Sequence, residues 1–259
     1  MKIWLSAVIW DEELKKGTSQ IELLEKVKAL SLSGVELRPY WNETDELNEF
    51  HQKATEMNLG LTYAGMEPII GSSLSDSLNH FEKMKESIDI AWQLGSSLLR
   101  VNISFEADWS LLRDENWQAQ AQAMITYAKS FGIELVVENP PCFAVGRIAE
   151  VKALLEALPG LKLTFDTGNW MIVGEHPVHA ARQLAPWIGY LHLKDVRFLE
   201  DGQYGHLQPG AGGLDFKNLL AEIYASGYQG PAVLEFHGGK DPEKRIQSAL
   251  EYLKEAGAY

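Results

Sequence analysis

The amino-acid sequence predicts an α/β fold, a TIM (β/α)8 barrel in which eight parallel strands alternate with helices. Short apolar runs typical of β-strands alternate with amphipathic helical patterns along the chain. Eight such runs in 259 residues give about 32 residues per unit, the size of a strand–helix module. No Ser/Gly-rich linker or charged run divides the sequence, so residues 1–259 are expected to form a single barrel domain.

The strands are predicted from apolar segments rich in β-branched and aromatic residues. They lie near residues 2–9, 34–38, 60–65, 97–103, 132–138, 161–166, 189–195 and 231–236. The first stretch, MKIWLSAVIW, has only a short apolar run and no small-residue cleavage pattern. We therefore expect a first strand rather than a signal peptide.

The helices are predicted from apolar residues at three- and four-residue spacing. The clearest patterns cover residues 19–31, 76–94, 114–131, 147–158 and 241–256. Gly95 and Gly132 stand where two of these helices should end, and Asp241 followed by Pro242 is typical of a helix start.

Composition excludes several classes of partner. A formal net charge of −13 repels phosphate backbones and anionic membranes, so neither nucleic acid nor a membrane is an expected partner. No apolar run is long enough to span a bilayer. Cys142 is the single cysteine, which excludes an intramolecular disulfide framework and favours a reducing, cytoplasmic location.

Four potential metal ligands end four consecutive apolar runs: Glu138, Asp166, His192 and Glu235. The runs are GIELVVEN (132–139), LKLTFDTGN (161–169), GYLHLKDV (189–196) and GPAVLEFH (230–237). In a parallel barrel such residues project from the carboxyl ends of the strands and converge. Three converging carboxylates and one imidazole favour one divalent metal ion, Mn²⁺ or Mg²⁺ first, with Co²⁺ or Zn²⁺ also compatible.

Ion pairing is the alternative to a metal, with Lys194, Arg100 or Arg197 satisfying the buried carboxylates. The alternation of a strand also places Lys194 on the face of His192. Lys194 is therefore either a substrate contact or a structural ion pair.

Other side chains near the strand ends are candidates for substrate contacts. The alternation pairs Glu36 with Arg38 and Glu235 with His237. The candidate substrate-binding residues are Glu36, Lys194, Asn169, Arg197 and His237. The aromatic side chains that follow strands, and could close over a sugar, are Trp10, Trp41, Tyr63, Trp109 and Trp170.

At these positions the chain resembles the xylose isomerase-like TIM-barrel superfamily of sugar and sugar-phosphate isomerases and epimerases. The resemblance rests on VVENP (136–140), TFDTGNW (164–170), HLKDV (192–196), PGAGGLDF (209–216) and VLEF (233–236). It implies that Glu138, Asp166, His192 and Glu235 bind one divalent metal and that Glu138 and Glu235 are catalytic, moving protons on opposite sides of the substrate. It also implies a small sugar or polyol as substrate, and a homodimer or homotetramer as the assembly.

Two departures from the family pattern leave the substrate open. Asn169 stands where many relatives have His, and Ala211 stands where many have Glu between two glycines. HLKDV also resembles the inosose dehydratases of this superfamily. The endonuclease IV type of DNA-repair enzyme carries extra histidines on strands three and four, where this chain has Tyr63-Ala64-Gly65 and Val101-Asn102-Ile103.

The sequence therefore predicts a metal-dependent isomerase or epimerase that moves a proton between two glutamates through a metal-stabilised enediolate. A dehydratase of the inosose dehydratase type is the alternative, because loss of a hydroxyl can follow the same proton abstraction. A sugar-binding barrel without catalysis is a third class.

Overall fold

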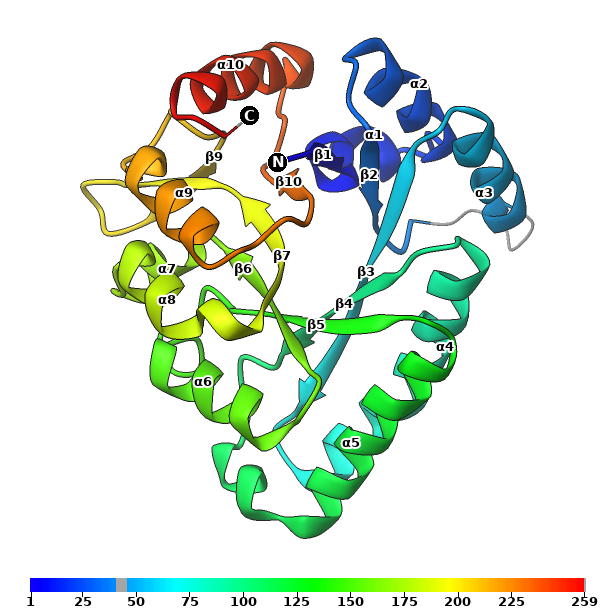
Figure 1. The fold of residues 1–259 in the computed structure, drawn as a ribbon, viewed down its shortest axis with the longest axis vertical. Coiled ribbons are helices and arrows are strands. Elements are labelled where there is room, and N and C mark those ends of the chain that lie inside the picture. The colour runs from blue at the N-terminus through cyan, green and yellow to red at the C-terminus, as the bar shows by residue number, and fades with distance from the viewer. Residues whose placement is uncertain (41–45, 259) are drawn as a thin grey trace.

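The computed structural model describes residues 1–40 and 46–258 and contains a closed barrel of parallel strands in the order β1-β10-β7-β6-β5-β4-β3-β2 (Figure 1). These strands are β1 (Ile3–Ser6), β2 (Gly34–Leu37), β3 (Gly60–Ile70), β4 (Leu98–Ile103), β5 (Glu134–Glu138), β6 (Lys162–Asp166), β7 (Ile188–Leu193) and β10 (Ala232–Leu234). The predicted TIM (β/α)8 barrel is confirmed, with one strand near each predicted segment.

Helices surround the barrel on its outer side (Figure 1). They are α1 (Asp11–Leu14), α2 (Ile21–Ala29), α3 (Glu46–Glu56), α4 (Leu74–Gln93), α5 (Glu115–Ser130), α6 (Ile148–Ala157), α7 (Asn169–Ile172), α8 (Pro177–Leu184), α9 (Phe216–Ala225) and α10 (Pro242–Glu255), with 3-10 turns η1 (Ala7–Trp10), η2 (Trp109–Arg113) and η3 (Ala185–Trp187). The five predicted helical patterns correspond to α2, α4, α5, α6 and α10. Within the described ranges, no helix combines the length and the apolar character that crossing a bilayer requires.

The helix ends follow the predicted signals in part. Gly95 and Gly132 adopt left-handed backbone conformations, with φ of 68° and 74°, immediately beyond α4 and α5. Residues with a side chain have difficulty adopting this conformation, so glycine ends both helices. Pro242 is the first residue of α10 as expected, but the side chain of Asp241 makes no capping hydrogen bond.

An apolar floor closes the interior of the barrel. The indole ring of Trp4 on β1 fills this interior so closely that a Cβ atom on Gly34 or Gly60 would collide with it. A buried cluster from three further strands packs against Trp4 and Leu98, and its members are Val136, Tyr190 and Val233.

Strand alternation places three of the predicted ligands next to this floor. Side chains two residues apart on a strand share a face. Glu138, His192 and Glu235 each follow a floor residue by two positions. The interior of the barrel therefore changes from apolar to charged toward the carboxyl ends of its strands.

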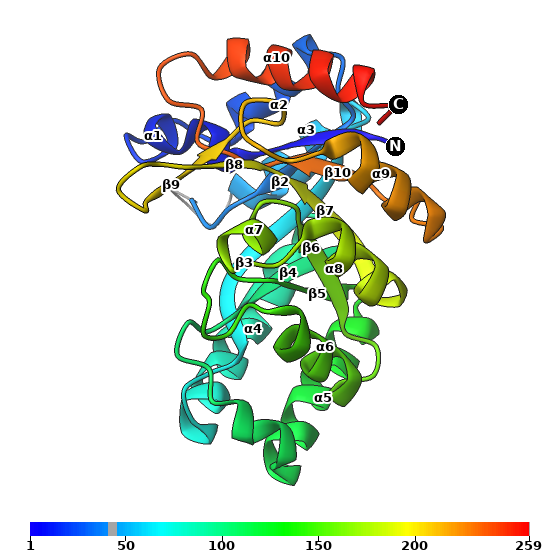
Figure 2. The same ribbon diagram turned by 90° about the vertical axis from the view of Figure 1, so that its left-hand side faces the viewer.

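A hairpin that the sequence analysis did not predict leaves the barrel after β7. It consists of β8 (Asp195–Phe198) and β9 (Tyr204–Leu207), which pair antiparallel. The predicted strand 189–195 instead ends at Leu193. In Figure 2 the hairpin lies on the same side of the molecule as α1, which follows the carboxyl end of β1.

The carboxylate of Asp195 organises the loop that follows this hairpin. It accepts hydrogen bonds from the backbone N–H groups of Val196, Gly210, Gly212 and Leu214, at 2.8 to 3.1 Å. A buried carboxylate with four donors is fully satisfied, so Asp195 holds the PGAGG loop in one conformation.

Candidate metal centre

The four predicted ligand residues lie together at the carboxyl ends of neighbouring strands. One ligand atom from each lies within 4.8 Å of those from the other three. Glu138 and Asp166 are the last residues of β5 and β6, His192 lies near the end of β7, and Glu235 follows β10 directly. None of the four is more than 9% exposed. Their backbones belong to the rigid barrel, so their relative positions are fixed by the fold.

Backbone amides orient the carboxylate of Asp166. Its Oδ1 accepts hydrogen bonds from the N–H groups of Gly168 and Asn169, both at 2.9 Å. The side chain of Asn139 binds the backbone N–H of Asp166 at 2.8 Å, and Asn169 donates to the Asn139 carbonyl at 2.9 Å. The TFDTGN segment thus folds around its own aspartate. Oδ2 of Asp166 remains as the oxygen that faces the centre.

Two buried cations contact the centre directly. Lys194 Nζ lies 2.8 Å from Asp166 Oδ2 and 3.0 Å from Glu235 Oε2. Arg100 Nη1 lies 2.8 Å from Glu138 Oε2. Both residues therefore make the ion pairs that the sequence analysis considered as the alternative to a metal.

A third cation, Arg38, contacts the centre from the position directly after β2. Its Nη2 donates to Glu235 Oε1 and lies 3.3 Å from Glu36 Oε1. Gln20 holds the Arg38 backbone on both sides, accepting from its N–H and donating to its carbonyl. Arg197, the remaining cation of the ion-pair alternative, donates instead to the carbonyl of Ala211.

The pKa values of Glu138 and Asp166 differ because the buried cations do not compensate the two carboxylates equally. Burial acts to raise the pKa of Glu138, but Arg100 and His192 together outweigh it and bring the pKa to about 2. For Asp166, burial is opposed by Lys194 but reinforced by the negative charges of Glu235 and Glu138, and its pKa is raised to about 7. The charge near Asp166 is therefore only partly compensated by protein cations.

The donor set fits a divalent cation. Three carboxylates and one imidazole are compatible with Mn²⁺, Mg²⁺, Co²⁺ or Zn²⁺, and ligand type alone does not distinguish them. The raised pKa of Asp166 means that additional positive charge would stabilise its ionised form.

Glu36 lies behind His192 and not on the open side of the centre. Its Oε2 is 2.7 Å from His192 Nε2, and its Oε1 accepts from the Ser6 hydroxyl at 2.9 Å. Nδ1 of His192 then faces Glu138 Oε1 and Glu235 Oε2, at 3.3 and 3.5 Å. Burial acts to lower the pKa of His192, but Glu36 and Glu235 raise it well above its ordinary value. Glu36 therefore fixes the imidazole so that Nδ1 points into the cluster.

A cavity of about 530 Å³ opens beside the centre. Glu138, Glu235, Lys194 and Asn169 contribute to its polar wall, and they include both predicted catalytic residues. The rest of the cavity wall includes a set of apolar residues: Met66, Pro68, Ile103, Phe105, Pro140 and Pro141. This combination of a few convergent polar groups with apolar walls is typical of small-molecule sites.

Comparison with known proteins defines the family. The sequence profile of the xylose isomerase-like TIM barrel matches residues 24–256. The chain belongs to this family. The match extends over every strand from β2 to β10 and over all four residues of the centre.

Two curated relatives each match part of the chain. The protein YihM of Escherichia coli, described as uncharacterized, is 27% identical over 74% of this chain and 56% of its own length. The inosose dehydratase of Mesomycoplasma hyopneumoniae strain 7448 is 31% identical over 51% of this chain and 49% of its own length. The aligned region thus spans about half the length of each relative.

Solved structures of the family share the fold over nearly the whole chain. A D-tagatose 3-epimerase-like protein superposes with a TM-score of 0.79 at 18% identity, covering 100% of this chain and 99% of the other. The IolI protein, whose structure holds a zinc atom, superposes with a TM-score of 0.78 at 13% identity, covering 99% and 98%. At such identities the likeness establishes the fold alone.

Two polar residues that line the cavity, Asn169 and His206, each have a buried hydrogen-bonding atom without a partner in the described part of the chain. Oδ1 of Asn169, at the position where the family resemblance suggests His, is buried without a hydrogen-bond partner in the described part of the chain. Nδ1 of His206 on β9 is in the same state. Burial and the Lys194 charge lower the pKa of His206 to about 4, so this imidazole is neutral. His206 was not among the residues predicted from the sequence, because its place on the cavity wall depends on the unpredicted hairpin.

Two predicted substrate-binding residues lie away from the cavity. Arg197 points outward on β8, and His237 is 65% exposed beside Asp11, outside the set of described residues that line the cavity. The alternation that paired Glu235 with His237 holds only within an extended strand, and β10 already ends at Leu234. A substrate contact by either residue stays a prediction.

The aromatic residues expected to close over a substrate are mostly part of the core. Trp10, Tyr63 and Trp170 are at most 2% exposed, and Trp109 is half-buried. Trp41 lies outside the described residues. Phe105, which the sequence analysis did not single out, is the exposed aromatic ring on the cavity wall.

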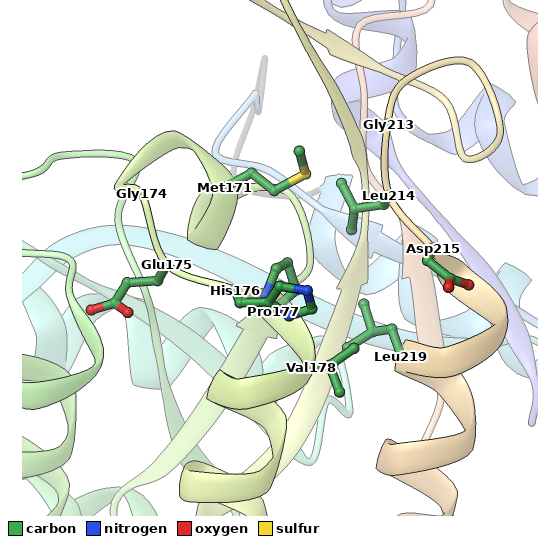
Figure 3. A pocket seen from close by; sticks show the side chains of 10 residues that line it. All are labelled: Met171, Gly174, Glu175, His176, Pro177, Val178, Gly213, Leu214, Asp215 and Leu219. Carbon is green, nitrogen blue, oxygen red and sulfur yellow. The ribbon is translucent and has the colours of Figure 1, made fainter.

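A second cavity, of about 400 Å³, lies between the starts of α8 and α9 (Figure 3). Met171, His176, Val178, Leu214 and Leu219 line it. It contains none of the four residues of the centre, so it is a separate feature of the surface.

Proposed function

We propose that the chain is a divalent-metal-dependent isomerase or epimerase of a small sugar or related polyol. The observation that carries this proposal is the placement of Glu138 and Glu235. Both belong to the four-residue cluster and both line the same cavity, so each can bind the cation and also reach a substrate. Mn²⁺ or Mg²⁺ is the proposed ion.

The bound cation would act as a Lewis acid on the substrate's carbonyl and hydroxyl oxygens and so acidify the adjacent C–H bond. Glu138 and Glu235 are then the proposed proton carriers: one takes the proton from that carbon, and the other delivers a proton to the opposite face or to the neighbouring carbon. Arg100 and Arg38 hold Glu138 and Glu235, respectively, in place. Both carboxyl groups have pKa values below their ordinary range, so both are ionised in the resting site.

The cavity walls favour an unphosphorylated substrate. The charged residues that line the cavity are Lys194 and the carboxylates Glu106, Glu138 and Glu235. Lys194 is already paired with Asp166. A phosphate group would therefore find no unpaired Lys or Arg side chain among the described residues that line the cavity. Hydroxyl groups, by contrast, can hydrogen-bond to the neutral polar side chains that line the cavity, such as Asn169 and His206.

A dehydratase of the inosose dehydratase type is the second candidate. The named relatives with this activity and the HLKDV segment favour it. Dehydration needs the same proton abstraction, followed by departure of a β-hydroxyl group. Neutral His206 or paired Lys194 would stand near that hydroxyl.

Deuterium exchange tests the proposal. The Mn²⁺-loaded protein is incubated in D₂O with free ketohexoses, ketopentoses, hydroxypyruvate and keto-inositols, and with their phosphates where these exist, and products are followed by NMR. Deuterium on the carbon beside the carbonyl with an intact skeleton supports the isomerase or epimerase. Loss of water with a new ultraviolet absorbance supports the dehydratase. Turnover without any metal, or through a covalent protein adduct, contradicts both.

A further inference from the structure

The ammonium group of Lys194 occupies the position of a counter-ion within the four-residue cluster. Its Nζ bridges Asp166 Oδ2 and Glu235 Oε2, at 2.8 and 3.0 Å, and its side chain is 9% exposed. Oδ1 of Asp166 is engaged by two backbone amides. The oxygen that Lys194 contacts is therefore the one that a metal ion would also need.

Charge balance makes simultaneous occupancy unfavourable. The buried carboxylates of the centre and its support are Glu36, Glu138, Asp166 and Glu235, and the buried cations are Arg38, Arg100 and Lys194. Metal coordination requires a neutral imidazole, and with His192 neutral this group carries one net negative charge before the metal is counted. A divalent cation would reverse it to one net positive charge, whereas departure of one protein cation would leave it neutral, and uncompensated buried charge is costly.

Lys194 is the cation best able to leave. Arg100 also donates to Asn102, and Arg38 bridges Glu36 and Glu235, so each guanidinium is held from two directions. The Lys194 ammonium is held by Asp166 and Glu235, the two carboxylates that the metal would take over. Its flexible four-carbon stem lines the adjoining cavity and can turn into it.

We propose that Lys194 is a tethered counter-ion, which a divalent cation displaces from Asp166 and Glu235 into the cavity, where its ammonium contacts a substrate oxygen. The inference rests on the proposed function for the presence of the metal. It adds an order of events, because the cation must bind before Lys194 becomes free for the substrate. It also explains how one lysine is an ion pair in one state and a substrate contact in the other.

Amine labelling of the natural protein tests the displacement. The protein is treated with formaldehyde and cyanoborohydride, with and without Mn²⁺, and methylation of each lysine is followed by peptide mass spectrometry. Lys194 should react several-fold faster with Mn²⁺ present. Lys162, which is half-buried at the start of β6 and donates to the Pro186 carbonyl, is the internal control and should not change. An unchanged or slower rate at Lys194 overturns the displacement.

The Lys194→Met variant tests the competition with the metal, with Lys162→Met as the matched control. Removal of the competing charge should lower the Kd for Mn²⁺ by at least about tenfold. The metal-free variant should melt at least about 5 °C lower, because Asp166 and Glu235 lose their buried partner. An equal or weaker affinity for Mn²⁺ overturns the proposal, and if this variant does not fold, the labelling of the natural protein decides.

The same experiments separate this inference from the proposed function. Mn²⁺ binding by the natural protein with Lys194 still protected overturns only the displacement. Failure of both the natural protein and Lys194→Met to bind Mn²⁺ overturns the metal centre and the inference together.

Discussion

The support of His192 by Glu36 leads to a quantitative prediction for Glu36→Gln. Glu36 is fully buried, and its carboxylate meets His192 at 2.7 Å, Ser6 at 2.9 Å and Arg38 at 3.3 Å. Glutamine keeps the volume but removes the charge and turns one acceptor into a donor. A hydrogen bond to a charged group contributes about 1.5–3 kcal/mol. Loss of a carboxylate behind a metal-binding histidine typically lowers metal affinity about 10–100-fold.

The prediction is therefore an increase of about 10–100-fold in the Kd for Mn²⁺, equivalent to about 1.4–2.7 kcal/mol. Isothermal titration calorimetry on chelator-stripped protein measures it, and circular dichroism and the melting temperature confirm that the variant is folded. Ser6→Ala is the matched control, since it removes one neutral donor from Glu36 and leaves the contact with His192 intact. A Kd within twofold of the natural value in folded Glu36→Gln refutes the role assigned to Glu36.

Three further predictions concern the ligands and the loop beside them. Replacing Glu138 or Glu235 with Gln keeps one oxygen donor but removes the basic carboxylate, so kcat at saturating metal should fall by at least about 10²-fold. His192→Ala should instead weaken metal affinity first, and its activity should recover partly in excess metal. Near-full activity in both Gln variants would exclude the two-glutamate mechanism. Burial and the neighbouring carboxylates raise the pKa of Asp166 to about 7 despite Lys194, and a metal ion must displace the proton that Asp166 carries below this pH. Calorimetry should therefore show at least about tenfold tighter Mn²⁺ binding near pH 8 than near pH 6. Equal affinities at the two pH values would contradict this prediction. Asp195→Ala deprives four backbone N–H groups of their acceptor, and each group left unsatisfied costs about 1–3 kcal/mol. Urea unfolding should therefore show a free energy of unfolding lower by at least about 3 kcal/mol, and Asp195→Asn should restore part of it.

The strand ends of the barrel could be predicted from the sequence because alternation and burial act together there. Glu138, Asp166 and His192 follow apolar runs whose inward face is set by residues such as Val136 and Tyr190. A polar residue two positions beyond a buried one must face the same interior. Convergence at one end then follows from closure of a parallel barrel.

The departures lie where the chain leaves the strands. Asp195 continues an apolar, β-like segment in the sequence, yet it ends the barrel strand because its carboxylate collects backbone donors from a loop up to 19 residues further on. No local pattern encodes that long-range contact. The hairpin that results brings His206 to the cavity and turns Arg197 away from it.

The role of Glu36 also could not be read from its strand. Alternation predicts that Glu36 and Arg38 face inward, which they do, but not how deep each lies. Glu36 lies nearer the apolar floor than Arg38 does, so its carboxylate contacts Nε2 of His192 and is fully buried. Depth within the barrel depends on the relative stagger of all the strands, which a single sequence pattern does not contain.

The most direct test of the central claim is an anomalous diffraction map from crystals grown with Mn²⁺. A metal centre at these residues should give one peak within about 2.0–2.6 Å of a carboxylate oxygen from each of Glu138, Asp166 and Glu235 and of an imidazole nitrogen of His192. A peak elsewhere, or metal-saturated crystals in which these four side chains point away from one another, would contradict it.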